Sequence, residues 1–312
     1  MSEHNTATER VVIKDRPVVD FSHFTSPEQL AGIERIEDVA LVVVPEALAA
    51  AYMAIPSADV AATIYVPGKA NVRVHTGSLS VGGDGLGTPD DVLIVIGMLV
   101  ITSPVTRPVP QRIHVIGSVL APRGSEQVLG QALAGGTGGV TFYKYAEGQD
   151  IKVYSGQVKL SGASLANPAG QPDDLLIMAG QVALTGAVTT VGYRHVVISG
   201  QVALPAASRD VIEPAVEIQG QVCWYTGDDP RVFTGDASLG PDFFRLLGHP
   251  VTLVVFGNLS IEAGVTEAIL LEKVAGITLF GDITAPPELV GVVQVLATDV
   301  FGDIRASDGL RS

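Results

Sequence analysis

The sequence predicts an all-β fold: a single-domain β-solenoid, or β-helix, with coils of about 20 residues. Two observations predict it. A short phrase, an apolar run followed by glycine, one polar residue and an aliphatic residue, returns at a nearly constant interval. The residues around each glycine also alternate with period two, as in a strand with one buried face. A few short helices are expected to replace sides of coils, mainly near the N-terminus.

The repeated phrase gives the register of the coils. The intervals between successive glycines are 20, 20, 39, 24, 20, 20, 37, 24 and 21, and we interpret 39 and 37 as two coils each. In all ten copies of the phrase, the residue two positions after the glycine is aliphatic, as at Val182, Val202 and Val222. These side chains are therefore expected to pile into continuous internal columns at the ordinary strand spacing of roughly 4.8 Å. The ten glycines are Gly77, Gly97, Gly117, Gly156, Gly180, Gly200, Gly220, Gly257, Gly281 and Gly302.

Four segments are expected along the chain. Residues 1–24 are polar and predict an N-terminal arm, and residues 25–66 predict cap turns made of strands and short helices. Ser26-Pro27-Glu28 has the capping hydroxyl, first-turn proline and acid of a helix start. Residues 67–306 predict the solenoid, and residues 307–312 a C-terminal tail. Further short helices are expected at 45–55, 125–134, 241–247, 266–272 and 287–293.

Composition narrows the classes of function. Apolar residues make up 47% and charged residues 17%, which excludes a mostly disordered chain. The net charge of −14 disfavours binding to nucleic acid or to anionic lipid. Cys223 is the single cysteine, so an intrachain disulfide is excluded. Because the sequence has no apolar run long enough to cross a bilayer, we expect no direct membrane insertion and a cytoplasmic location.

Searches for catalytic patterns give no catalytic residue, no metal ligand and no cofactor. The glycine-rich segments at 82–87 and 135–140 lack the lysine and the helix that phosphate-binding loops need. The histidines fall in different columns and on separated coils, which argues against a zinc site. We therefore expect the protein not to be an enzyme, and we assign no cofactor.

Three groups of residues are nevertheless candidates for a role. In four successive repeats the residue directly after the glycine is glutamine, and these glutamines predict a ladder of amide hydrogen bonds that fixes the register. The alternative is that the same column of glutamines binds a ligand. Two aspartates in the same column on consecutive coils predict an acidic pair, which is either solvated or serves as a catalytic or cation-binding pair. The last coil has no following cap, which leaves a strand edge for assembly. These groups are, in order, Gln157, Gln181, Gln201 and Gln221; Asp282 and Asp303; and Val300, Gly302, Ile304 and Ala306.

Phrases such as SGQVKLSG and AGQVALTG, over roughly residues 72–306, resemble bactofilins, the polymer-forming bacterial cytoskeletal proteins. The resemblance implies a right-handed β-helix that polymerises end to end without nucleotide. This chain has about twice the usual core length of that family and longer coils. It also lacks the short hydrophobic N-terminal segment that some members carry.

The leading hypothesis is a non-enzymatic scaffolding protein whose partner is another copy of itself, bound through the solenoid ends as an oligomer or filament. The second hypothesis is a carbohydrate-active or ligand-binding β-helix that uses Asp282 and Asp303. The third is a solenoid that binds another protein through one flat face and does not polymerise. The residues alone leave the three open.

Overall fold

The computed structural model describes residues 11–107, 109–133, 139–227 and 229–307. The first ten residues of the predicted arm, and the tail beyond residue 307, lie outside the described residues. The chain divides into two compact units, Met1–Phe142 and Tyr143–Ser312. Strands dominate both units, helices are few and short, and the strand pairs whose register is recorded among the described residues are parallel. The all-β prediction is confirmed at that level.

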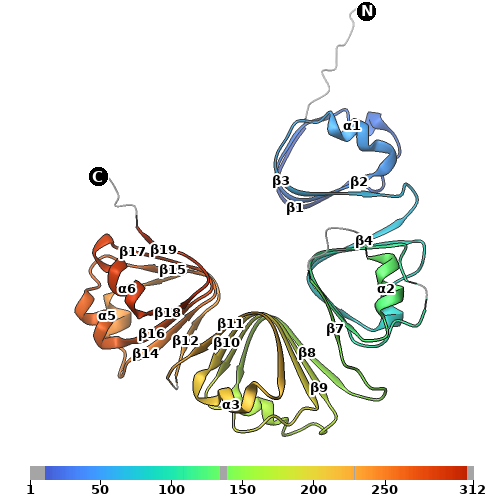
Figure 1. Ribbon diagram of the computed structural model, residues 1–312. Helices are drawn as coiled ribbons and strands as arrows, with labels where there is room; N and C mark the ends of the chain where they lie inside the picture. Colours follow the sequence, from blue (N-terminus) through green and yellow to red (C-terminus); the bar gives the residue numbers. More distant parts are fainter. Residues whose placement is uncertain (1–10, 108, 134–138, 228, 308–312) are drawn as a thin grey trace, which may run out of the picture. The chain divides into compact units, whose positions relative to one another are not determined.

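The first unit contains two sheets, which we call the first and second stacks (Figure 1). The first stack has the order β1–β2–β3 and the second the order β4–β5–β6–β7. The first stack consists of β1 (Val11–Asp20), β2 (Ile33–Pro45) and β3 (Ser57–Val66). The second consists of β4 (Asn71–Val81), β5 (Asp91–Ile101), β6 (Arg112–Pro122) and β7 (Val140–Tyr143).

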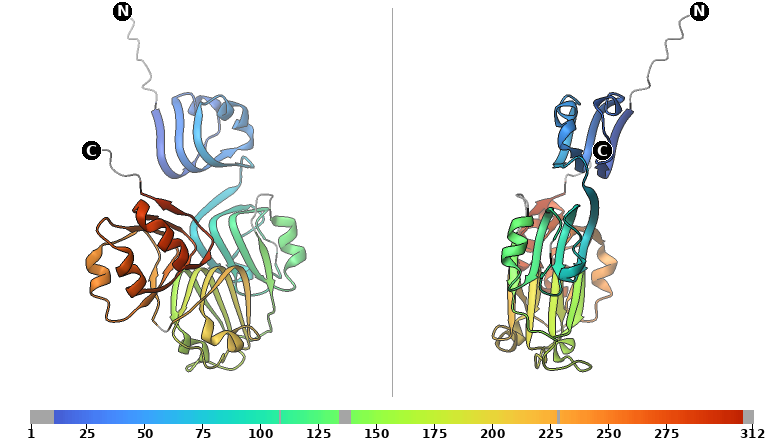
Figure 2. Two further views of the ribbon diagram at one scale, coloured as in Figure 1. Left: turned by 60° about the vertical axis from the view of Figure 1, so that its left-hand side comes forward. Right: turned by 90° about the vertical axis from the view of Figure 1, so that its right-hand side faces the viewer.

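The second unit contains the third and fourth stacks, and Figure 2 shows the strands of each sheet side by side. The third stack is one sheet of β8 (Ile151–Ser161), β9 (Leu175–Thr185), β10 (His195–Pro205) and β11 (Val216–Tyr225). The fourth has two sheets, because each layer is split at its glycine into two short strands. One sheet is β12 (Arg231–Phe233), β14 (Val251–Val255), β16 (Val274–Leu279) and β18 (Ala297–Val300). The other is β13 (Ala237–Leu239), β15 (Asn258–Ile261), β17 (Asp282–Ala285) and β19 (Ile304–Ala306).

The predicted columns are confirmed within each stack. Val182, Val202 and Val222 are direct partners on three neighbouring strands. The glycines are partners too, as Gly77 is of Gly97 and Gly97 of Gly117. In the inner layers, the side chains two and four residues after the corner glycine form the stack's own core, together with those two and four residues before it. The interval between successive glycines therefore reports one strand and one connection, which together we call a layer.

The glycine at each corner is required by close approach of backbones. A Cβ placed on Gly200 would overlap the carbonyl oxygen of Gly180 in the neighbouring layer, and Gly200 also has φ +123°. L-residues other than glycine rarely adopt that conformation. In the fourth stack φ is not positive, but a Cβ on Gly281 would overlap the carbonyl oxygen of Gly257 in the same way.

The first stack uses aspartate at the same corner. Asp15, Asp38 and Asp59 lie in register and have φ of 54°, 52° and 54°, the left-handed region that aspartate tolerates best after glycine and asparagine. The prediction of an arm over residues 1–24 is therefore corrected, since residues 11–20 form β1. The polar sequence of β1, with Pro17 within it, suits an edge strand that is exposed on most of its length.

One continuous solenoid over residues 67–306 is not observed, because the chain leaves one sheet and starts another at two places. Residues 144–150 separate β7 from β8, and residues 226–230, which include Pro230, separate β11 from β12. The long interval between Gly220 and Gly257 is thus not two layers. Gly235, preceded by VFT, is the first corner of the fourth stack and follows Gly220 by less than one layer.

These breaks reveal a longer repeat that spans a whole stack. The segments that contain the first layer of the second, third and fourth stacks read NVRVHTGSLSV, DIKVYSGQVKL and DPRVFTGDASL. Gly77, Gly156 and Gly235 are equivalent in these three segments and evenly spaced along the chain. The sequence therefore has two periods, one for the layer and one for the stack.

Short helices lie in the connections of all four stacks, not mainly near the N-terminus. They form where proline, an acid or a capping hydroxyl starts them, as at Thr266, whose side chain accepts from the backbone N–H of Ile269. In Figure 1, α5 and α6 lie side by side across the fourth stack from the corner where its two sheets meet. The α-helices are α1 (Ala49–Met53), α2 (Glu126–Ala132), α3 (Arg209–Ile212), α4 (Pro241–Arg245), α5 (Glu267–Lys273) and α6 (Val290–Leu296). The 3₁₀ helices are η1 (Pro27–Gln29), η2 (Glu46–Leu48), η3 (Gly83–Gly85), η4 (Gly162–Ala166), η5 (Ala206–Ser208) and η6 (Pro287–Leu289).

Within each unit, neighbouring stacks pack through the outer faces of their sheets. In the second unit, residues after the corner of the third stack, such as Ala203 and Tyr225, contact residues before the corner of the fourth, such as Phe256 and Phe280. In the first unit, Leu41 and Val43 of β2, among others, pack in the same manner against β4 and β5. This arrangement explains why many strands are buried on both faces.

Candidate functional site

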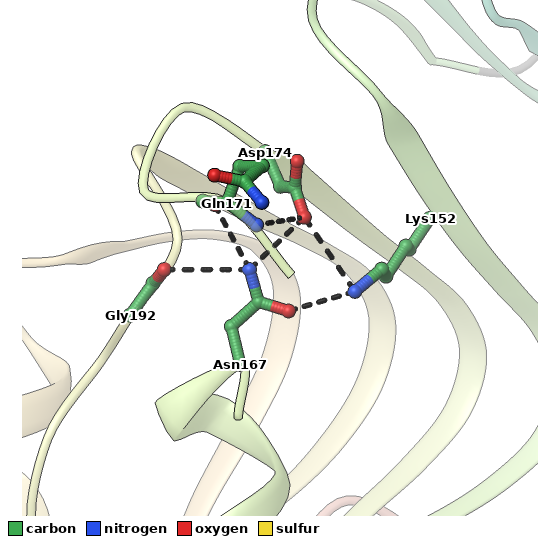
Figure 3. A network of polar contacts seen from close by, with 5 residues as sticks. All are labelled: Lys152, Asn167, Gln171, Asp174 and Gly192. Atoms are coloured by element: carbon green, nitrogen blue, oxygen red, sulfur yellow. Dashed lines mark hydrogen bonds and ion pairs between the residues drawn. The ribbon is translucent and has the colours of Figure 1, made fainter. Parts of the chain in front are cut away.

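A buried polar cluster lies at the start of the third stack. Asn167, at the C-cap of η4 with φ 51°, and Asp174, just before β9, are only 6% and 4% exposed. Asn167 Nδ2 donates to Asp174 Oδ2 over 3.0 Å, to the Gln171 carbonyl over 3.0 Å and to the Gly192 carbonyl over 3.5 Å. Figure 3 shows the Asn167 amide group at the centre of these contacts.

A cation completes this cluster. Lys152 Nζ, from β8, donates to Asn167 Oδ1 over 2.7 Å and lies 3.5 Å from Asp174 Oδ2. The Gln171 backbone N–H also donates to Asp174 Oδ2, over 3.0 Å. The hydrogen bond from Asn167, followed by that from Gln171, holds the pKa of Asp174 below its usual range. Asp174 is thus a carboxylate held by several donors, which suits locking a loop better than exchanging a proton.

The second stack carries an equivalent cluster. Its sequence GTPDD at 87–91 matches GQPDD at 170–174, and in both the second aspartate is buried. Asp91 accepts from the Thr88 backbone N–H over 2.7 Å and from Asn71 Nδ2 over 2.8 Å. These bonds, that from Thr88 first, lower the pKa of Asp91. Arg73, the equivalent of Lys152, donates to the carbonyl of Leu86.

In the fourth stack the equivalent position is Val251, six positions before Gly257, and it is part of the apolar core. The position six residues before the corner glycine is thus a hydrogen-bonded aspartate in two stacks and an apolar core residue in the fourth. We conclude that the aspartate clusters are structural clasps, which tie the loop before the second layer to the first strand.

The four predicted glutamines form one column on the third stack, and three of them reach the neighbouring stack. Gln181 Nε2 donates to Gln201 Oε1 over 3.4 Å, and Gln201 Nε2 to Gln221 Oε1 over 3.3 Å. The same nitrogens donate to the carbonyls of Phe256, over 3.3 Å, and Phe280, over 3.5 Å. Gln157 likewise donates to the carbonyl of Thr234. These hydrogen bonds to the fourth stack were not predicted from the sequence. The accepting carbonyls belong to residues far along the chain, and no pattern around the glutamines indicates them.

The two predicted aspartates lie in adjacent layers of the fourth stack. The Asp303 backbone N–H donates to Asp282 Oδ1 over 3.0 Å. Arg305 forms an ion pair with Asp303 and lies 3.8 Å from Asp282 Oδ2. An arginine shared by both carboxylates gives each of them a partner, and this arrangement fits a solvated ion-pair network.

The predicted assembly edge consists of the last layer of the fourth stack. β18 and β19 each have one neighbouring strand. Val300 and Ala306 are exposed and Gly302 and Ile304 are half-buried. Phe256, Phe280 and Phe301 form a stacked column with ring centroids 4.8 and 5.7 Å apart, and Phe301 at its end is 46% exposed. The edge is not unique, since every described sheet has an open strand at each end.

Three further observations bear on chemistry. Among the described residues, no group of three or more His, Cys, Asp or Glu side chains is arranged to hold a metal ion. Cys223 points away from its own core but is buried against the fourth stack, and burial raises the pKa of its thiol to about 12. No helix in the described ranges has the length and hydropathy needed to cross a bilayer.

Comparison of the chain with protein-family models, with curated proteins and with solved structures finds no match.

Proposed function

We propose that this protein is a non-enzymatic scaffold, a set of short β-solenoid stacks in the cytoplasm that self-associates through the open ends of its stacks. The observation that carries the proposal is the open edge of β18 and β19, where the stacked column of Phe256 and Phe280 ends in half-exposed Phe301. Parallel strands with unpaired N–H and C=O groups are templates for another chain.

The polar features support a structural role. The clasps around Asp91 and Asp174 are closed networks, and Asp282 and Asp303 are occupied by Arg305. These are arrangements that hold a shape, and each titratable group in them already has partners. The proposal agrees with the resemblance of the repeated phrases to bactofilins, and we propose that relationship as well.

Light scattering and electron microscopy on the purified full chain test this function. We expect assemblies that grow with protein concentration, and that grow further when salt screens the net charge of −14. A chain that stays monomeric at high concentration and at every salt concentration would contradict the proposal. Glycan cleavage or binding lost in Asp282→Asn/Asp303→Asn would instead favour the carbohydrate-active alternative.

A further inference from the structure

The ends of the third and fourth stacks are level with each other. Gln157 in the first layer of the third stack bonds to Thr234 in the first layer of the fourth. Gln181 does the same in the second layers and Gln201 in the third. Because both stacks have four layers, they begin together at β8, β12 and β13 and finish together at β11, β18 and β19.

Two level stacks make one broad starting edge and one broad finishing edge. We infer that a second copy of the chain places its starting edge, β8 with β12 and β13, on the finishing edge of the first copy in register. This inference rests on the proposed self-association and names the surfaces that perform it. Each contact would continue the strand spacing already present inside the stacks.

Six of the eight inward columns match across this junction. In the third stack, the last layer presents Ile218, Val222 and Trp224, and the first layer of the second copy would present Tyr154, Val158 and Leu160 in the same columns. In the fourth stack, Val300, Ile304 and Ala306 would meet Phe233, Ala237 and Leu239. These six columns are apolar on both sides, so stacking would extend that part of the existing cores. In the two remaining inward columns, Val216 would meet Lys152 and Ala297 would meet Arg231. Tyr154, which is 42% exposed, and Val300, which is 45% exposed, are large apolar members that this contact would bury.

The glutamine column is compatible as well. Gln221 would meet Gln157 and continue the amide column that already joins Gln181, Gln201 and Gln221. Asp299 on the finishing edge would lie in the outward column of Val232 on the starting edge.

One like-charged contact is created, between Asp303 and Asp236 of the second copy. Arg305 lies beside it, already paired with Asp303 and close to Asp282. A guanidinium in that position can bond to carboxylates on both sides. The second copy is also the partner whose backbone fits, because its β12 and β13 repeat the same pair of short strands split at a corner glycine.

Disulfide cross-linking in the full chain tests the register. In a Cys223→Ala background, Gln157→Cys and Gln221→Cys are introduced together. Within one chain these positions are three layers apart, roughly 14 Å, which is too far for a disulfide. Between stacked copies they would be neighbours in one column. We therefore expect a ladder of covalent multimers under oxidising conditions.

The matched control is Ser155→Cys with Gln221→Cys, which shifts one cysteine by two positions along the same exposed strand. If the chain assembles but the register pair cross-links no better than the shifted pair, the inference is wrong while the proposed self-association stands. If the parent chain does not assemble at all, the proposed function fails with it.

A second variant does not depend on cysteine chemistry. Val300→Lys places a charge in an apolar column of the junction, whereas Met53→Lys places one at an exposed apolar residue of α1 in the other unit. We expect Val300→Lys to shift the population to monomer with an unchanged circular dichroism spectrum, and Met53→Lys to assemble normally. Normal assembly of a folded Val300→Lys chain would overturn the inference.

Discussion

Gln181 Nε2 donates to the backbone carbonyl of Phe256 over 3.3 Å, although 75 residues separate the two in sequence. With the equivalent bonds of Gln157 and Gln201, it fixes the third stack against the fourth, layer by layer. A column that keeps neighbouring strands in register thereby also holds two stacks together.

We expect Gln181→Leu to lower the free energy of unfolding by about 1–3 kcal/mol, because the Phe256 carbonyl and the neighbouring amides lose a donor. Gln131→Leu, at an exposed position of α2, is the control and should change stability little. Urea denaturation of both variants measures the difference. Equal effects would show that the column does not join the stacks.

Gly200→Ala is expected to destabilise the protein by at least about 2 kcal/mol, because φ is +123° and the added Cβ would overlap the Gly180 carbonyl oxygen. Gly291→Ala in α6, where no heavy atom lies within 4 Å of the new Cβ, should instead stabilise by about 0.5–1 kcal/mol. Thermal unfolding of both variants provides the measurement. A harmless Gly200→Ala would contradict the close approach of the corners.

Asp38→Val is expected to cost about 1–2 kcal/mol, because a β-branched residue is strained at φ 52°. Asp38→Gly removes that strain and should be tolerated. Chemical denaturation compares the two variants. A larger loss for glycine than for valine would mean that the carboxylate, and not the backbone conformation, is what the corner requires.

The clasp in the third stack predicts a pH-dependent loss of stability. The pKa of Asp174 is lowered in the folded state, so its contribution is present above the unfolded pKa of about 3.9 and disappears as the pH falls through the lower folded value. Asp174→Ala should lower the melting temperature at pH 7 more than Asp173→Ala, whose side chain forms an exposed ion pair with Arg194. The gap between wild type and Asp174→Ala should narrow in acid, and a gap that stays constant would exclude this linkage.

His114 predicts a second pH effect, in the first unit. It follows Val74 and Ile94 in one column, its Nε2 is buried without a partner among the described residues, and burial together with Arg112 lowers its pKa. A neutral imidazole is therefore favoured in the fold. Stability should fall as the pH drops below the unfolded value of about 6.5 towards the lower folded one. His114→Gln should flatten this slope between pH 7 and 5, as followed by urea titrations at each pH.

Cys223 should not react with a thiol reagent such as DTNB while the protein is folded, because its thiol is buried between two stacks and its pKa is raised to about 12. In denaturant one thiol per chain should react at once. Rapid labelling of the native protein would mean that the third and fourth stacks separate readily in solution.

Local rules in the sequence predict the layer and its register. Val182, Val202 and Val222 align because apolar residues must alternate around each corner, and helix starts such as Ser26 and Thr266 carry their own caps. The breaks between stacks are less visible. Asp15, Asp38 and Asp59 are corners that a search for glycine passes over.

The candidate site is harder to predict than the fold. Asn167 itself has the left-handed backbone conformation at the C-cap of η4, and its side chain bonds to Asp174 from there. Lys152, which completes the cluster, lies on β8. The repeated GxPDD is the one signal that marks this clasp in the sequence. The glutamine column bonds to backbone carbonyl groups. Every residue has such a group, so the sequence does not show which residues accept these bonds.

The helices of the fourth stack have a consequence for its growth. Packed helices prefer axes about 8–10 Å apart, whereas neighbouring strands are about 4.8 Å apart. Three helices, α4, α5 and α6, follow one another in the three connections between four layers, so crowding on that side increases with each added layer. A junction between two copies would be a step with no connecting chain, and therefore no helix, which would relieve the crowding once every four layers. In the proposed assembly, separate copies that each contribute four layers would therefore build a long fibre with less helix crowding than one continuous chain of the same number of layers.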